Sequence, residues 1–298
     1  MILLIILPIP FLSSLFIALI PAVVAVDALG SVGKRSINTA TYNDLLFYFK
    51  YASSAYNHVC DKPNGNVLIK MLDSSDDTQG FIARDDQKKE IVVSLRGTES
   101  IQDLLTDLQI NQAPFNVAGV LGPTGVMVHN GFQNAWRSVA TQVISTVNTQ
   151  LVENGGYSVV TTGHSLGGAL SSLAAITLKE ILPNTHIRMY TYGQPRTGNK
   201  AYANWVDQRF AFENLFRSVN MYDPAPHIFP HLILDYTHHG IEYWTFRGPP
   251  SAANTKKCAR TGEDPNCSLS TELLGLPPLL IEDHLFYFAI FYQTSFCS

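Results

Sequence analysis

One serine in this 298-residue chain has the neighbours that a nucleophile needs. It lies in the segment GHSLG (163–167), between a β-branched run at 157–162 and a helical pattern at 168–182. In a sharp turn from strand to helix, the flanking glycines remove side chains that would collide with nearby backbone. The pattern therefore predicts a nucleophile elbow that presents Ser165. Taken without this context, the same five residues would also fit a glycine-rich turn with an N-capping serine.

Such a serine needs a histidine that takes its proton and a carboxylate that fixes the tautomer of that histidine. On a sheet that carries an elbow, the acid and then the histidine follow the serine, each on a loop after a later strand. We favour Asp223, because it directly follows a strand-like run and precedes prolines that keep the chain extended. The other acids weighed for this role are Asp207, Asp235, Glu242, Asp264 and Asp283.

Among the histidines that follow Ser165, we favour His284 as the base. It comes last, after the final strand-like run at 241–246, and the apolar segment at 285–292 can anchor it. Chain order alone leaves His227 and His231 open.

Acyl transfer also needs hydrogen-bond donors for the oxygen that becomes negative. The backbone N–H of Leu166, the residue after the nucleophile, is one expected donor. Thr98 is the second, because it follows the strand-like run at 90–95 and offers both an N–H and a hydroxyl. A simple turn after a strand is the competing interpretation of Thr98.

Just beyond Thr98, four apolar residues share one face of a short helical pattern: Ile101, Leu104, Leu105 and Leu108. Such a helix could close over the site with its apolar face inward and swing out toward an oily surface. An ordinary helix packed on the core fits the same spacing.

Taken together, these residues resemble the fungal-type class 3 lipases, secreted α/β-hydrolases that include triacylglycerol lipases and feruloyl esterases. The resemblance runs from about Tyr42 to the C-terminus. It is carried by VVSLRGTESIQDLLTDL (92–108), VHNGF (128–132), VVTTGHSLGGAL (159–170), YTYGQPRTGN (190–199), YDPAPHIFP (222–230), HHGIEYW (238–244) and DHLFYF (283–288).

The resemblance implies a triad of Ser165, Asp223 and His284, with Thr98 and Leu166 forming the oxyanion hole. It also implies a lid at about 99–107, hydrolysis of triacylglycerols through an acyl-enzyme, and gating at lipid–water interfaces. The alternative is an esterase of the feruloyl type that acts on soluble substrates, in which the lid helix would be a fixed rim. A non-catalytic binding protein is disfavoured, because no triad or oxyanion position is visibly lost.

Composition agrees with an enzyme that acts on a lipid or ester. The formal net charge is −4 and 46% of the residues are hydrophobic, which is ample for a full core and leaves no basic patch for nucleic acid. Neither a metal, a cofactor nor an obligatory protein partner is implied.

The N-terminus reads as a targeting segment. Residues 1–26 carry no charge, and prolines and a small-residue stretch near Ala25 favour a cleaved signal peptide at 1–25 over a membrane anchor. The dibasic pair Lys34-Arg35 predicts a propeptide at 26–35, so the single mature domain would span 36–298 and be secreted.

The four cysteines allow three pairings and lack metal-ligand spacing. The simplest arrangement is one disulfide across a short loop and one between opposite ends of the mature domain. The resemblance likewise implies Cys258 with Cys267 and Cys60 with Cys297. Disulfides of this kind are expected in a protein that reaches an oxidising compartment, such as the extracellular space.

The rest of the chain alternates between the two kinds of pattern. Strands are expected near 66–72, 79–84, 90–95, 187–192 and 215–222, and helices near 42–57, 130–152 and 199–210. This alternation predicts the α/β class, with a mixed, mostly parallel central sheet flanked by helices. The resemblance specifies the α/β-hydrolase fold with a short helical lid.

Overall fold

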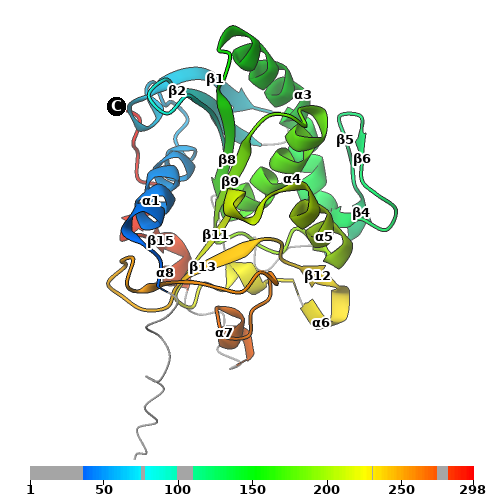
Figure 1. Ribbon diagram of the computed structural model, residues 1–298, viewed down its shortest axis with the longest axis vertical. Coiled ribbons are helices and arrows are strands. Elements are labelled where there is room, and N and C mark those ends of the chain that lie inside the picture. Colours follow the sequence, from blue (N-terminus) through cyan, green and yellow to red (C-terminus); the bar gives the residue numbers. More distant parts are fainter. Residues whose placement is uncertain (1–35, 75–77, 99–109, 230, 274–280) are drawn as a thin grey trace, which may run out of the picture. The chain divides into compact units, whose positions relative to one another are not determined.

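The computed structural model describes residues 36–74, 78–98, 110–229, 231–273 and 281–298. A large sheet forms the centre of this described part, in the order β1-β2-β3-β8-β9-β11-β13-β14 (Figure 1). The strands are β1 (Val67–Asp73), β2 (Gln79–Asp85), β3 (Glu90–Leu95), β8 (Ser158–His164), β9 (Ile187–Tyr192), β11 (Leu215–Asn220), β13 (Ile241–Thr245) and β14 (Thr255–Lys257). The five strands from β3 to β13 run parallel, and the outer strands pair antiparallel. This is the mixed, mostly parallel sheet that the sequence predicts.

Helices cover both faces of the sheet (Figure 1). On one face, α1 (Thr39–Ser54) packs over β8 and β9 and shares an aromatic-rich core with them. On the other face, α3 (Asn130–Glu153), α4 (Leu166–Ile181) and α5 (Lys200–Arg209) enclose a larger aliphatic core. The α1 helix begins earlier than predicted, because the side chain of Asn38 caps it by accepting a hydrogen bond from the Thr41 N–H at 2.8 Å.

Short elements that the sequence did not predict complete the described part. Those in a second sheet are β4 (Gln112–Pro114), β7 (Met127–His129), β10 (Gly198–Asn199) and β12 (Tyr236–Thr237). Two hairpins pair β5 (Asn116–Val117) with β6 (Val120–Leu121) and β15 (Phe286–Tyr287) with β16 (Ile290–Phe291). The short helices are α6 (His231–Leu234), α7 (Leu269–Leu273) and α8 (Ile281–Leu285), with 3-10 turns at Pro63–Gly65, Phe212–Asn214 and Ala225–His227.

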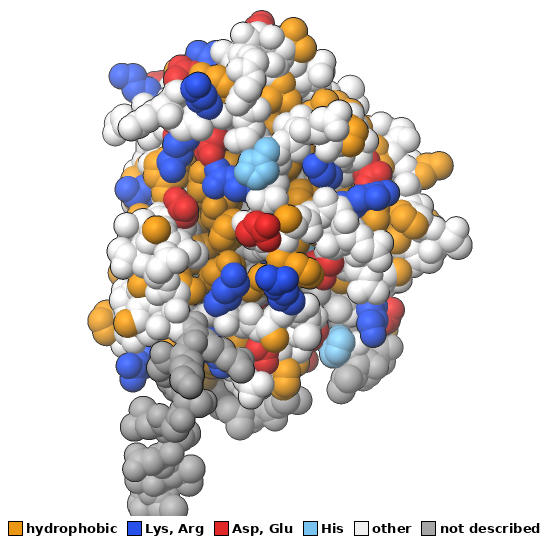
Figure 2. All heavy atoms as spheres, in the orientation of Figure 1, with side chains coloured by type: hydrophobic (Ala, Val, Ile, Leu, Met, Phe, Trp, Pro, Cys, Tyr) orange, Lys and Arg blue, Asp and Glu red, His pale blue; other side chains and the backbone are white. Residues whose placement is uncertain are grey.

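Two disulfides cross-link the described part of the chain, one between distant segments and one across a short loop. Cys60 bonds Cys297, 237 residues further on, and Cys258 bonds Cys267, so the structure has the pairing that the resemblance implies. Within the described ranges, every helix is too short or too polar to cross a membrane. On the face drawn in Figure 2, basic and acidic side chains are interspersed among hydrophobic ones, so positive charge does not gather into one patch there.

Candidate active site

Ser165 occupies the turn between β8 and α4 in a conformation that is rare for a non-glycine residue. Its φ is 59° and its ψ is −130°, and the residue is fully buried. Both neighbouring glycines are required here. A Cβ on Gly163 would lie 2.2 Å from the carbonyl oxygen of Gly167, and a Cβ on Gly167 would lie 2.1 Å from that of Leu95. Strain held in place by such tight packing is typical of a nucleophile elbow.

His284 and Asp223 form a fully buried pair beside this turn. His284 lies in α8, and its Nδ1 is 2.8 Å from Asp223 Oδ1 and 2.9 Å from Oδ2. Asp223 follows β11 at the carboxyl end of the parallel strands, the end at which β8 also delivers Ser165. The centroid of the His284 ring is 4.4 Å from that of His164, the residue before Ser165.

The carboxylate of Asp223 is held by further donors. Tyr287 donates its hydroxyl to Oδ2 at 2.5 Å, and the N–H of Ala225 donates to Oδ1 at 2.8 Å. Burial alone would raise the pKa of Asp223, but the charge of His284 and these hydrogen bonds together lower it. Asp223 is therefore an anion that accepts a hydrogen bond from the Nδ1–H of His284. The other ring nitrogen, Nε2, is left free to take a proton.

Ser165 Oγ, His284 Nε2 and Thr98 Oγ1 are among the buried polar atoms that have no hydrogen-bond partner in the described part of the chain. Buried polar groups are normally paired. The roles predicted for these residues, nucleophile, base and oxyanion donor, each require an atom that is free to meet a substrate.

The loop that carries Thr98 runs against the elbow. It continues from β3, whose Leu95 pairs with Gly163 of β8, and a Cβ on Gly97 would lie 3.1 Å from Ser165 Cβ. Leu166 is the first residue of α4, and the N–H groups in the first turn of a helix lack intrahelical partners. Leu166 therefore adjoins Ser165 in the chain, and Thr98 follows the glycine that packs against Ser165. The predicted lid residues Ile101, Leu104, Leu105 and Leu108 lie outside the described residues.

The other acids weighed from the sequence serve other contacts. Asp207 accepts from the Gly240 N–H, and Asp283 accepts from the Tyr222 N–H. Asp264 accepts from backbone N–H groups within its own loop, Glu242 pairs with Arg217, and Asp235 accepts through its carbonyl from the Lys200 N–H.

His227 and His231, the other two candidates for the base, contact residues other than Asp223. His227 Nδ1 lies 3.2 Å from Glu272 Oε2, and His231 Nδ1 lies 3.2 Å from the carbonyl oxygen of Tyr236. Of the three candidates, only His284 contacts Asp223 in the structure.

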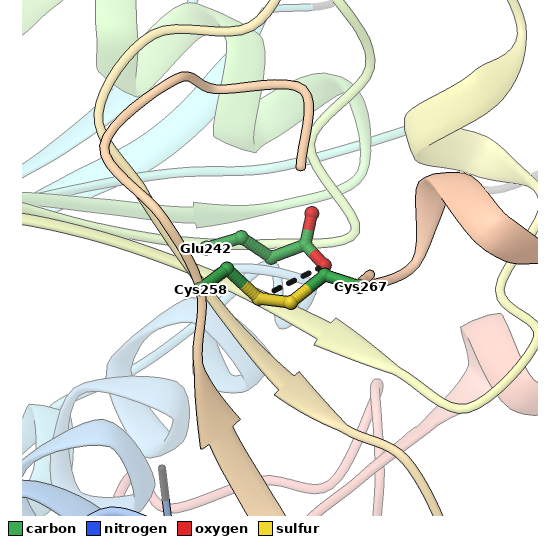
Figure 3. Close-up of side chains that lie close together, drawn as sticks. All are labelled: Glu242, Cys258 and Cys267. Carbon is green, nitrogen blue, oxygen red and sulfur yellow. Dashed lines mark hydrogen bonds between the residues drawn. A yellow bond between two sulfur atoms is a disulfide. The ribbon is translucent and has the colours of Figure 1, made fainter. Parts of the chain in front are cut away.

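Glu242 also belongs to a close cluster with Cys258 and Cys267, whose ligand atoms lie within 4.8 Å of one another (Figure 3). The two sulfurs are joined in a disulfide and offer no thiolate to a metal. Ser268 donates to Glu242 through both its N–H and its hydroxyl at 2.9 Å, and Arg217 donates to the same carboxylate. The cluster is therefore a buried structural contact that anchors the loop at 258–267 to the rest of the domain.

Sequence reasoning missed the partners of the triad. Tyr287 lies in an apolar run that looked like a simple anchor, and only its alternation with the exposed Phe286 in β15 could have marked it as inward-facing. The sequence carries no signal for His164, which stands at the variable position of the elbow motif.

Comparison with known proteins agrees with this geometry. The family model for lipase (class 3) matches residues 92–232. A lipase of Rhizomucor miehei is 31% identical over 281 residues, a match that covers 89% of this chain and 73% of that protein. The secreted mono- and diacylglycerol lipase 1 of Fusarium solani is 32% identical over 231 residues, covering 72% of this chain and 66% of that protein.

A solved structure, the triacylglycerol lipase of Penicillium expansum, superimposes with a TM-score of 0.79 at 26% identity, over 88% of this chain and 98% of that one. The described sheet and its flanking helices therefore have the α/β-hydrolase fold of the fungal lipases. The sequence match, the fold and the elbow agree, and this chain belongs to the class 3 lipase family.

Proposed function

We propose that this protein is a secreted triacylglycerol lipase that cleaves carboxylic esters through an acyl-enzyme on Ser165. One observation carries the proposal. Ser165 stands strained in a strand-to-helix turn beside a buried His284–Asp223 pair, and both Ser165 Oγ and His284 Nε2 have no partner among the described residues. The names of the relatives support the substrate class, since they include a triacylglycerol lipase and a lipase of mono- and diacylglycerols.

Acylation begins when Ser165 Oγ attacks the ester carbonyl carbon and His284 Nε2 takes its proton. The Nδ1–H of His284 stays bonded to Asp223, whose negative charge stabilises the imidazolium. The carbonyl π bond breaks, and its electron pair moves to the carbonyl oxygen.

That oxygen needs donors already in place. The N–H of Leu166 and the N–H and hydroxyl of Thr98 border the elbow and supply them in this proposal. Loss of one such donor typically costs about 10²- to 10³-fold in rate. The intermediate then collapses, the bond to the leaving alcohol breaks, and His284 returns the proton to that alcohol.

Deacylation repeats the steps with water. His284 removes a proton from water, the resulting hydroxide attacks the acyl carbon, and the proton returns to Ser165 as the fatty acid leaves. Every proton thus passes through His284.

The apolar stripe at 101–108 favours a lid that responds to lipid surfaces over the fixed rim of a feruloyl-type esterase. Hydrolysis of tributyrin measured across its solubility limit, with Ser165→Ala as control, separates the two. We expect a Ser165-dependent jump in rate once droplets form. Smooth saturation below the limit, with no jump, would keep the serine chemistry and overturn the lipase assignment.

We also propose a signal peptide at 1–25, a propeptide at 26–35 and a mature chain that begins at Ser36. The contacts of Ser36 and Ile37 support this boundary, because Ser36 pairs with Lys256 of the edge strand β14 and the Ile37 N–H donates to the Thr255 carbonyl. N-terminal sequencing of the secreted protein should return Ser36 first. A start within 1–25 would instead favour a retained anchor.

A further inference from the structure

His164 links the strand that carries the nucleophile to the residue that serves as base. It is fully buried, and its Nε2 lies 2.8 Å from the backbone carbonyl oxygen of His284. On the other side of the ring, Nδ1 lies 3.0 Å from the hydroxyl oxygen of Tyr56. No step of the mechanism uses this histidine, although it stands directly before Ser165 in the chain.

The contacts fix the tautomer of His164. A backbone carbonyl can only accept, so Nε2 must carry a hydrogen and donate it to His284. Burial, followed by the positive charge of His284, lowers the pKa of His164 to about 3, so the ring is neutral at working pH. Nδ1 is then bare, and the hydroxyl of Tyr56 donates to it.

Tyr56 extends the link to the oxyanion loop. A Cβ added to Gly97 would lie 2.2 Å from the Tyr56 hydroxyl oxygen and 2.7 Å from the carbonyl oxygen of His164. The hydroxyl therefore packs directly on the residue before Thr98. One short line of contacts joins the oxyanion loop, the strand that ends at Ser165 and the backbone of His284.

The backbone of His284 needs such support. Helix α8 has only five residues, so its internal hydrogen bonds are few. Its neighbours in the chain are held by side chains and by the hairpin: Asn220 donates to the Asp283 carbonyl at 3.0 Å, and the Tyr292 N–H donates to the Leu285 carbonyl at 2.9 Å. The His284 carbonyl receives its bond from His164.

We propose that His164 is a positioning residue for the ester hydrolysis proposed above, on which this role rests: its ring holds the main chain of His284 while its own backbone carries Ser165. Because one residue touches both parts, the spacing of nucleophile and base is set by a single rigid connection. Tyr56 keeps the ring in the donating tautomer.

Three variants test the role. His164→Gln places an amide N–H near the original Nε2 and retains a donor, His164→Leu removes the donor, and Tyr56→Phe removes only the hydroxyl. The matched control is Tyr51→Phe, which deletes a buried hydroxyl from the same helix region that bonds Asn66 rather than the site. Each protein is assayed for kcat and KM on dissolved p-nitrophenyl butyrate, for its rate of inactivation by a fluorophosphonate, and for thermal unfolding.

Since a misplacement of about 1 Å can cost about 10²-fold in rate, we expect His164→Leu to lower kcat and the inactivation rate by about that factor, with KM little changed. His164→Gln should retain most of the wild-type kcat and inactivation rate. Tyr56→Phe should lower both about fivefold, which corresponds to the loss of one neutral hydrogen bond. Tyr51→Phe should keep the wild-type kcat.

A purely structural role for His164 would give a different result. All His164 variants would then unfold more easily, while the folded fraction reacted with the fluorophosphonate at the wild-type rate, and that result would overturn the inference. If His164→Leu does not fold, Tyr56→Phe and His164→Gln decide the matter by the same rates. A wild-type protein that fails to react at Ser165 would instead contradict the proposed function itself.

Discussion

A methyl group added at Gly193 should slow the reaction at Ser165 strongly, at a modest cost in folding stability. Gly193 follows β9 with a φ of +57°, and its N–H donates to the Ser218 carbonyl at 3.1 Å. A Cβ there would lie 2.7 Å from Asp223 Oδ2 and 2.7 Å from both Nδ1 and Cε1 of His284. The variant Gly193→Ala therefore pushes directly on the pair that we propose activates Ser165.

The size of the effect follows from these distances. An ordinary contact begins at 3.4 Å, so the imidazole and the carboxylate must each retreat by about 0.7 Å or lose their shared geometry. Displacements near 1 Å cost about 10²-fold in rate, which is about 2.7 kcal/mol of transition-state stabilisation. The left-handed backbone adds a separate cost of about 1 kcal/mol to folding stability.

Gly156 supplies the control. Its φ is +84°, and nothing lies within 4 Å of the position where a Cβ would stand. Gly156→Ala therefore carries the same kind of backbone strain but contacts no residue of the site. The difference between the two variants isolates the effect of pressing on His284 and Asp223.

Both variants should be assayed by the rate of fluorophosphonate inactivation and by urea unfolding. We expect similar losses of stability, with a drop of about 10²-fold in the inactivation rate for Gly193→Ala alone. Equal inactivation rates in the two variants would contradict this prediction, because the His284–Asp223 pair would then tolerate the displacement that the added methyl group forces.

Asp223→Asn should lower the inactivation rate by about 10⁴-fold, because an amide no longer fixes the tautomer of the base; a loss below tenfold would contradict this. His239 is buried, and burial followed by the charge of Arg217 lowers its pKa to about 3, so the unfolded chain binds more protons and stability falls as the pH falls from about 6.5 to 3. His239→Gln should flatten that dependence by up to about 1.4 kcal/mol per pH unit in urea titrations, and an unchanged slope would count against it. Replacing Cys60 and Cys297 by Ala opens a 237-residue loop and should cost about 5 kcal/mol, seen as a melting point lower by about 10–20 °C; a shift of only a few degrees would be inconsistent.

The sequence predicts the elements of the sheet well because their signals are local. The run at 90–95 is strand β3 over the same residues, and the strand expected at 187–192 is β9. β-branched and apolar runs of this length have few alternatives once turn residues bound them. The four strands of the second sheet have two or three residues each, too few for any periodicity to appear.

The residues of the candidate site likewise fall into those that a local sequence pattern predicts and those that only tertiary contacts identify. The elbow around Ser165 is a local pattern, so its turn could be read directly from neighbouring residues. The preference for His284 over His227 rests on its place after the last strand-like run and on the apolar segment that follows it. Only the tertiary structure shows that His227 lies against Glu272. Tyr287 reaches Asp223 across 64 residues of chain, and no spacing rule predicts that hydrogen bond.

In the mechanism proposed here, Ser165 is the nucleophile and His284 activates it. The most direct measurement is peptide mass spectrometry of the secreted protein after brief treatment with a fluorophosphonate, beside a His284→Ala variant. We expect the added mass on the peptide that contains Ser165 in the wild type, and almost none of it in the variant. Modification of a different residue, or ester hydrolysis that persists with Ser165 unmodified, would contradict it.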